Sequence, residues 1–163
     1  MKIETLRELF VDELQDLHSA EQQITKALPK LIKTSHDPQL KQAFEHHLEE
    51  TKNHVTRLEQ ILQRLNEKPK GKTCEGMKGL LKEGEERISD GGEADVLDAG
   101  IISAAQRVEH YEIAAYGSAR TYAELLGDQE AVRLLSQTLD EEKAADSKLN
   151  QVARTVNVEA KAA

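Results

Sequence analysis

Hydrophobic side chains recur every three or four residues in four long stretches of the chain, which is the period of one face of an α-helix. These stretches predict helices over about residues 4–35, 38–65, 94–126 and 129–154. In the first stretch the apolar positions are Leu6, Phe10, Leu14, Leu17, Ile24, Leu28 and Leu31. No stretch has the alternating pattern of a β-strand, so the chain is expected to be all-α.

Residues that start and stop helices agree with these limits. Asp37 is a good N-cap with Pro38 at the first helical position, and Gly127 follows the third helix. Pro29 lies inside the first stretch and is expected to kink that helix or end it early. The last residues, "VNVEAKAA", are expected to fray.

The connections differ in length, and this predicts the topology. The first and last pairs of helices are joined by short links, so each pair should be an antiparallel hairpin. The middle connection holds a loop, "NEKPKGK", and a Gly-broken short helix over about residues 75–89. Two hairpins joined by one long crossover form the four-helix bundle of ferritin-like proteins, and 163 residues suffice for one such domain.

Composition and charge narrow the classes of function. The net charge is −8, with 30 acidic and 22 basic residues, and no basic stripe suggests nucleic-acid binding. The sequence has no signal-peptide pattern and no apolar run long enough for a membrane span, so we expect a cytoplasmic protein without a membrane partner. A single cysteine, Cys74, excludes an intramolecular disulfide.

Each of the four stripes is interrupted near its middle by ionisable residues. They are Glu21 in the first helix, Glu50 and His54 in the second, Glu109 and Glu112 in the third, and Glu142 and Asp146 in the fourth. Residues three or four apart share a helical face, so each pair could converge on one point in the bundle. Taken singly, each glutamate could instead be a solvated residue at the edge of its stripe, and His54 a hydrogen-bonded core residue.

A metal site explains all these interruptions together. Isolated buried carboxylates cost several kcal/mol, and unpaired like charges at close range cost more. Two divalent cations would neutralise most of this charge. Carboxylate oxygens and imidazole nitrogens suit iron or manganese, and the chain has no set of thiolates that would favour structural zinc.

Several segments resemble the YciF-type branch of the ferritin-like superfamily. They are "LFVDELQDLHSAEQQITKALPKL", "FEHHLEETKNHVTRLE", "CEGMKGLLKEG", "QRVEHYEIAAYGSARTYAELLG" and "LLSQTLDEEKAADSKL". The resemblance covers nearly the whole chain in order. It implies a bacterial stress-response protein with a ferritin-like bundle, a homodimer and a di-metal site.

Two elements of the wider superfamily's ligand pattern are present. The pair Glu109 and Glu112 resembles the third-helix Glu-x-x-Glu of rubrerythrins, and Glu21 resembles the first-helix glutamate. The usual Glu-x-x-His of the second and fourth helices is missing, because Thr51 and Ala145 occupy the relevant positions.

In place of that motif the chain offers pairs four residues apart, from Glu50 to His54 and from Glu142 to Asp146. His47 and Glu141 are the reserve candidates. A site with a single histidine would be rich in carboxylates, which makes manganese a rival to iron.

Two functions remain open at this stage, since a third, mineralising iron storage, needs a large shell and the resemblance implies a dimer instead. The bundle could be a di-iron enzyme that reduces peroxide or uses O2 to oxidise Fe(II), with an outside reductant because Cys74 alone cannot build an electron-transfer module. It could instead be a metal-stabilised dimeric scaffold without catalysis. Tyr116, one turn beyond Glu112, could bond a ligand or relay an electron, although packing is the simpler role.

Overall fold

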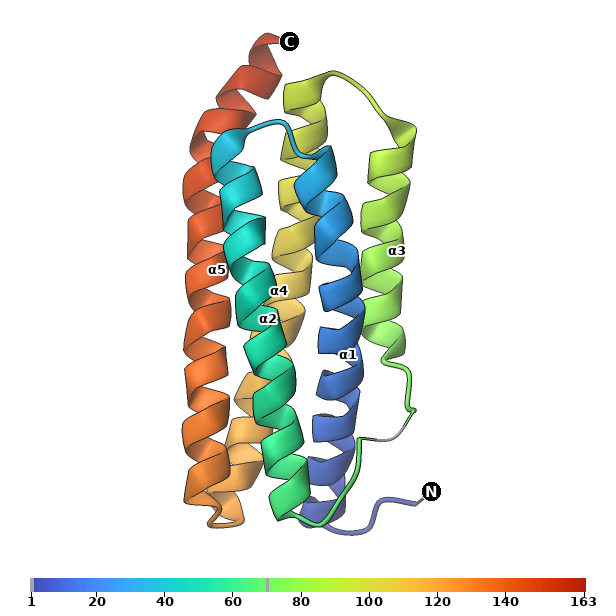
Figure 1. Ribbon diagram of the computed structural model, residues 1–163, viewed down its shortest axis with the longest axis vertical. Helices are drawn as coiled ribbons and strands as arrows, with labels where there is room; N and C mark the ends of the chain where they lie inside the picture. Colours follow the sequence, from blue (N-terminus) through green and yellow to red (C-terminus); the bar gives the residue numbers. More distant parts are fainter. Residues whose placement is uncertain (1, 70) are drawn as a thin grey trace.

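The computed structural model describes residues 2–69 and 71–163, and it contains five helices and no strand within those ranges. The helices are α1 (Leu6–Thr34), α2 (Pro38–Arg64), α3 (Glu75–Asp90), α4 (Ala94–Leu125) and α5 (Gln129–Ala162). Four of them form an elongated bundle in which α1 and α2 make one antiparallel hairpin, and α4 and α5 make the other (Figure 1). The shorter α3 belongs to the crossover and lies beside α1 and α4.

The helix starts follow from local side-chain chemistry. Thr5 and Glu8 form a capping box at the start of α1, and the Asp37 carboxylate accepts a hydrogen bond from the Leu40 amide at the start of α2. Asp98 on α4 is buried, and its carboxylate accepts hydrogen bonds from the backbone amides of His36 and Asp37 at 2.6–3.0 Å. Asp98 therefore ties the turn of one hairpin to the other hairpin.

Two features of the helix ends differ from an expectation. Pro29 lies inside α1, which continues to Thr34, so of the two expected effects of Pro29 the early end does not occur. The C-terminal tail does not fray at residue 154, because α5 continues to Ala162. Val152 and Val156 are both buried in a hydrophobic cluster, and this burial of apolar surface stabilises the extra turns.

The interior of the bundle consists of two hydrophobic clusters. One lies towards the α1–α2 turn and includes Ile24, Phe44 and Leu149. The other lies towards the α4–α5 turn and includes Leu17 and Leu58. The ionisable residues of the four stripes fall between these clusters along each helix, so the middle of the bundle is the region that the sequence marks as a candidate site.

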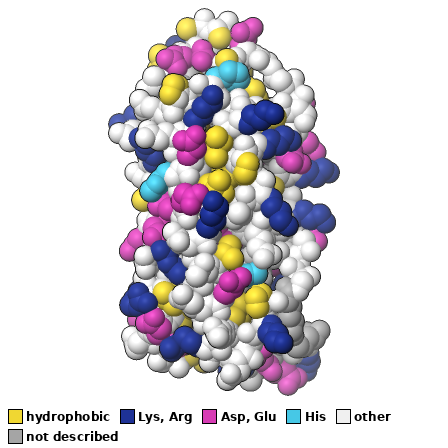
Figure 2. Space-filling model, viewed as in Figure 1, with side chains coloured by type: hydrophobic (Ala, Val, Ile, Leu, Met, Phe, Trp, Pro, Cys, Tyr) yellow, Lys and Arg dark blue, Asp and Glu magenta, His cyan; other side chains and the backbone are white. Residues whose placement is uncertain are grey.

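The distribution of charge is visible on one face of the molecule. Basic and acidic side chains are interspersed on the face drawn in Figure 2, with small hydrophobic areas between them. No helix in the described part of the chain is long and apolar enough to cross a membrane.

Candidate metal centre

Six buried ionisable side chains meet in the middle of the bundle. They come from all four long helices and are Glu21 (α1), His47 and His54 (α2), Glu109 and Glu112 (α4), and Glu142 (α5). None of the six is more than 5% exposed. Such a group of carboxylates and imidazoles is stable in an apolar interior only when its charge is compensated.

The six side chains form two overlapping sets. The outer position is defined by His47, Glu109, Glu112 and Glu142, and the inner position by Glu21, His54 and Glu142. Within each set the potential ligand atoms all lie within 4.8 Å of one another. Because Glu142 belongs to both sets, its two oxygens can serve two neighbouring cations.

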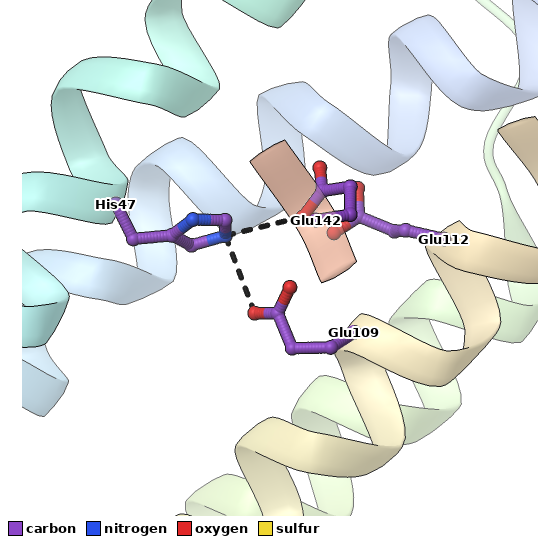
Figure 3. Close-up of side chains that lie close together, drawn as sticks. All are labelled: His47, Glu109, Glu112 and Glu142. Atoms are coloured by element: carbon purple, nitrogen blue, oxygen red, sulfur yellow. Dashed lines mark ion pairs between the residues drawn. The ribbon is translucent and has the colours of Figure 1, made fainter. Parts of the chain in front are cut away.

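At the outer position, the His47 ring and the Glu109 carboxylate face each other (Figure 3). His47 Nε2 lies 3.2 Å from Glu109 Oε1 and 3.7 Å from Glu142 Oε2. Glu112 comes from the next turn of α4 after Glu109 and points to the same place (Figure 3). His47 and Glu109 are the two members of the group with some remaining exposure, 5% and 3%.

The inner position is fully enclosed. His54 Nδ1 lies 2.9 Å from Glu142 Oε1 and 3.2 Å from Glu21 Oε1, and all three side chains are 0% exposed. The buried hydroxyl of Tyr116 donates a hydrogen bond to Glu21 Oε1. Tyr116 therefore packs against the site and also satisfies one oxygen of Glu21.

Each imidazole has a carboxylate at the nitrogen that faces away from the site. His54 Nε2 lies 2.9 Å from Glu141, which also accepts two hydrogen bonds from Arg57 at 2.6 and 3.0 Å. His47 Nδ1 lies 3.3 Å from Glu50. An ionised carboxylate can only accept, so each outward nitrogen donates, and the inward nitrogen is left as the possible metal ligand.

Many inward-facing atoms have no hydrogen-bond partner among the residues that the structure describes. They are Glu21 Oε2, His47 Nε2, His54 Nδ1, Glu109 Oε2 and both oxygens of Glu112 and Glu142. The imidazole–carboxylate distances are within ion-pair range, but the ring nitrogens are not aligned for hydrogen bonds. Buried polar atoms without partners are rare, and a cluster of them pointing to one region is what a metal site requires.

The charges of the group also fit two divalent cations. The four central carboxylates carry four negative charges when ionised, and two divalent cations carry four positive charges. Both histidines can then be neutral ligands. With nitrogen and oxygen donors and no cysteine in the group, the donor set suits iron or manganese.

Without a cation, the same residues hold protons. Burial alone would lower the pKa of His54, but the carboxylates of Glu142 and Glu21 raise it to about 11. The pKa of His47 is also raised, because Glu109 and Glu50 outweigh the effect of burial. Burial and neighbouring negative charges hold the carboxyl pKa values of Glu109 and Glu112 well above their usual range.

The structure brings together five of the seven residues that the sequence suggested, namely Glu21, His54, Glu109, Glu112 and Glu142. Glu50 and Asp146 lie outside the central group. The Glu50 carboxylate is turned towards the imidazoles of His46 and His47 on its own helix. Asp146 accepts a hydrogen bond from Gln106 and lies 3.3 Å from His110 Nε2.

His47, which the sequence suggested only as a reserve candidate, belongs to the central group. The signal was present in the sequence, because His47 and His54 are seven residues apart on the same stripe, with Thr51 between them. Thr51 is buried and its hydroxyl donates to the His47 carbonyl, so it does not act as the missing glutamate. The other reserve residue, Glu141, contacts the outward face of His54.

Comparisons with known proteins agree with this architecture. Residues 5–163 match the family described as "Domain of unknown function (DUF892)". Protein YciF of Escherichia coli (strain K12) is 45% identical over 154 residues, which are 94% of this chain and 93% of YciF. The crystal structure of YciF, described as a stress protein, aligns with a TM-score of 0.91 at 44% identity, over 94% of this chain and 98% of that chain.

Two further solved structures are similar. YcfI from Rhodopseudomonas palustris aligns with a TM-score of 0.88 at 46% identity, over 91% of this chain and 95% of that chain. An Anabaena variabilis protein with a DJ-1/ThiJ/PfpI-like and a ferritin-like domain aligns with a TM-score of 0.66 at 20% identity, over 93% of this chain and 37% of that chain. The latter similarity concerns the fold alone. The expected ferritin-like, YciF-type bundle is therefore confirmed, and this chain belongs to the DUF892 family.

Proposed function

We propose that this protein binds two divalent metal ions in its core, iron in preference to manganese, and uses them in redox chemistry with peroxide or O2. The observation that carries this proposal is the set of buried, unpartnered oxygen and nitrogen atoms directed from four helices to two positions that share Glu142. The similarity to YciF, a stress protein, supports a role in a stress response.

The residues of the chain have distinct tasks in this proposal. Glu142 links the two positions, while Glu112 contributes two oxygens that have no other partner. Glu141 holds the His54 ring so that Nδ1 faces the inner position. The Tyr116 hydroxyl donates a hydrogen bond to Glu21 Oε1 and so orients the Glu21 carboxylate.

When bound, a ferrous pair supplies the two electrons that reduce one hydrogen peroxide, with two protons, to two water molecules. The enclosure of the inner position keeps bulk water away from Glu21, His54 and Glu142. The chain has a single cysteine, Cys74, so the electrons that restore the ferrous state come from an outside reductant.

A second candidate is a metal-stabilised scaffold without catalysis. It is favoured by the inner position, whose three side chains are 0% exposed and offer no route for an oxidant from solvent. In that case the cations would serve only to neutralise carboxylates and hold the two hairpins together.

The homodimer implied by the sequence resemblance stays a prediction, which sedimentation velocity would test.

The two functions are separated by loading the purified protein with Fe(II) without oxygen, measuring iron per chain and adding hydrogen peroxide. The redox function predicts about two irons per chain and about one peroxide consumed per two irons, with a ferrous-to-ferric change in absorbance. Bound metal without an absorbance change would support the scaffold. A stably folded protein that binds no metal would contradict both.

Replacing Glu112 by alanine tests the assignment of the outer position. The Glu112→Ala variant should lose about one ion per chain, because this glutamate belongs to the outer set only. Glu124→Ala is the matched control, since Glu124 is exposed on the same helix and should leave the metal content unchanged.

A further inference from the structure

A cavity of about 450 Å³ lies between α2 and α5 and reaches the outer metal position. His47, Glu50 and Glu109 line the end of the cavity at the middle of the bundle. None of the inner-position residues lines it. The cavity therefore connects the outside of the bundle with one of the two metal positions, and its volume is typical of a site for a small organic molecule.

The walls of the cavity are mostly apolar. Ala43 and Phe44 contribute from α2, and Ala144, Ala145 and Leu149 contribute from α5. Two consecutive alanines on α5 leave open the volume that larger side chains would fill beside the outer position. This lining favours an aliphatic or aromatic body over a strongly hydrated ion.

The far end of the cavity carries a positive charge. The helices α2 and α5 are antiparallel neighbours (Figure 1), so Gln42 and Lys148 lie at the end remote from Glu50 and His47. Lys148 is exposed and forms no ion pair with any residue in the described ranges 2–69 and 71–163. By contrast, His46 at the cavity is already paired with Glu50 at 3.0 Å.

We propose that this cavity binds a small carboxylic acid with an apolar body, with the carboxylate of the ligand at Lys148 and the body pointing towards His47. The opposite orientation would place the ligand carboxylate beside Glu50, an acidic side chain that already pairs with His46 and His47, where like charges repel. The bound molecule would then present its apolar end to the outer metal position. The role of the ligand at the metals rests on the proposed function. Binding of the ligand depends only on the cavity.

Calorimetric titration of the full-length protein, before and after removal of metal by a chelator, tests the proposal. The probes are octanoate and 3-phenylpropanoate for the aliphatic and aromatic cases, with 1-octanol as the neutral counterpart of octanoate. Octanoate should bind about three- to tenfold more tightly than 1-octanol, because Lys148 recognises the charge. Equal affinity for octanoate and 1-octanol, or no binding of either carboxylate, would overturn it.

Two pairs of variants locate the binding. Lys148→Gln should weaken carboxylate binding about three- to tenfold, while Lys143→Gln, an exposed lysine on the same helix outside the cavity, should not. Ala144→Phe should fill the cavity and abolish binding, while Ser147→Phe, exposed and outside the cavity, should preserve it. Binding that survives Ala144→Phe in a folded protein would overturn the assignment.

The failure of this proposal and that of the proposed function are distinguishable. Metal per chain, measured on the same samples, reports on the metal positions alone. Metal binding without carboxylate binding would refute only the cavity proposal. Carboxylate binding by a protein that takes up no metal when Fe(II) is supplied would leave the cavity assignment standing and refute the metal centre.

Discussion

The inner and outer metal positions share Glu142 but differ in their surroundings. The inner position is enclosed on every side, with Tyr116 bonded to Glu21 and with the Glu141–Arg57 pair behind His54. The outer position adjoins the cavity between α2 and α5, and the carboxylate behind its histidine, Glu50, is partly exposed. Under the proposed function, the enclosed position would retain its cation and the position beside the cavity would admit a ligand.

The largest effect is expected from the residue common to both positions. Glu142→Gln keeps the shape of the side chain but removes its charge, so both cations lose a ligand and the remaining carboxylates no longer balance two divalent ions. We expect metal content to fall from about two ions per chain to nearly none, measured by elemental analysis after dialysis. Asp140→Asn, exposed on the same helix, is the control. Retention of both ions by Glu142→Gln would show that Glu142 is not shared.

A smaller effect should separate the two positions. His47→Ala removes a ligand from the outer position, and His54→Ala removes one from the inner position. Each variant should keep about one ion per chain. The ion kept by His47→Ala should be lost slowly to an added chelator, because the inner position is 0% exposed, and the ion kept by His54→Ala should be lost quickly. Equal rates of loss would contradict the distinction between a closed and an open position.

The sequence was sufficient to predict the fold because helical periodicity extends over four long stretches and the connections differ clearly in length. The sequence also identified those residues of the central group that interrupt the middle of an apolar stripe, such as Glu112 and Glu142. It failed where several polar residues lie within one turn. Glu50 and His47 are three residues apart on α2, and only packing decides that the imidazole points inward and the carboxylate outward.

The same limit applies on α5 and at the C-terminus. Glu142 and Asp146 lie one turn apart, but Asp146 is drawn towards Gln106 and His110 at the edge of α4. The tail of α5 is helical because Val156 is buried against distant parts of the chain, which local propensity does not reveal. The cavity depends on the volumes of side chains on two helices at once, so no single motif could have indicated it.

The pH dependence of the metal-free protein sharpens the comparison through His54. Its pKa in the folded state, about 11, lies above the value of 6.5 expected after unfolding, so its stabilising contribution is fully present below about pH 6.5 and is lost as the pH rises towards 11. Between pH 7 and 9 one such proton corresponds to a loss of about 2 to 3 kcal/mol of unfolding free energy.

Urea unfolding in the presence of a chelator measures this loss. His54→Gln should show a shallower pH dependence than the unaltered protein. The stabilisation that bound metal adds should instead grow as the pH rises, because more of the ligands are deprotonated and deprotonated ligands bind cations more tightly. A metal-free protein whose stability is constant or increases from pH 7 to 9 would be inconsistent with a charged His54 in the core.

The smallest effect concerns the carboxylates behind the two histidines. Glu141→Gln is made in the His47→Ala background, so that only the inner ion remains. It should weaken the binding of the inner ion about tenfold, because a neutral amide holds the His54 imidazole less firmly and leaves Arg57 without its pair. Glu50→Gln, made in the His54→Ala background, should weaken the outer ion by less, because the Glu50 contact is longer at 3.3 Å and water can replace it at a partly exposed position. Competition with a coloured chelator measures both affinities, and Glu49→Gln, exposed on α2, is the control in each background. An equal loss of metal affinity at both positions would mean that enclosure does not strengthen the contact between Glu141 and the His54 imidazole. The two positions would then differ only in how easily solvent and ligands reach them.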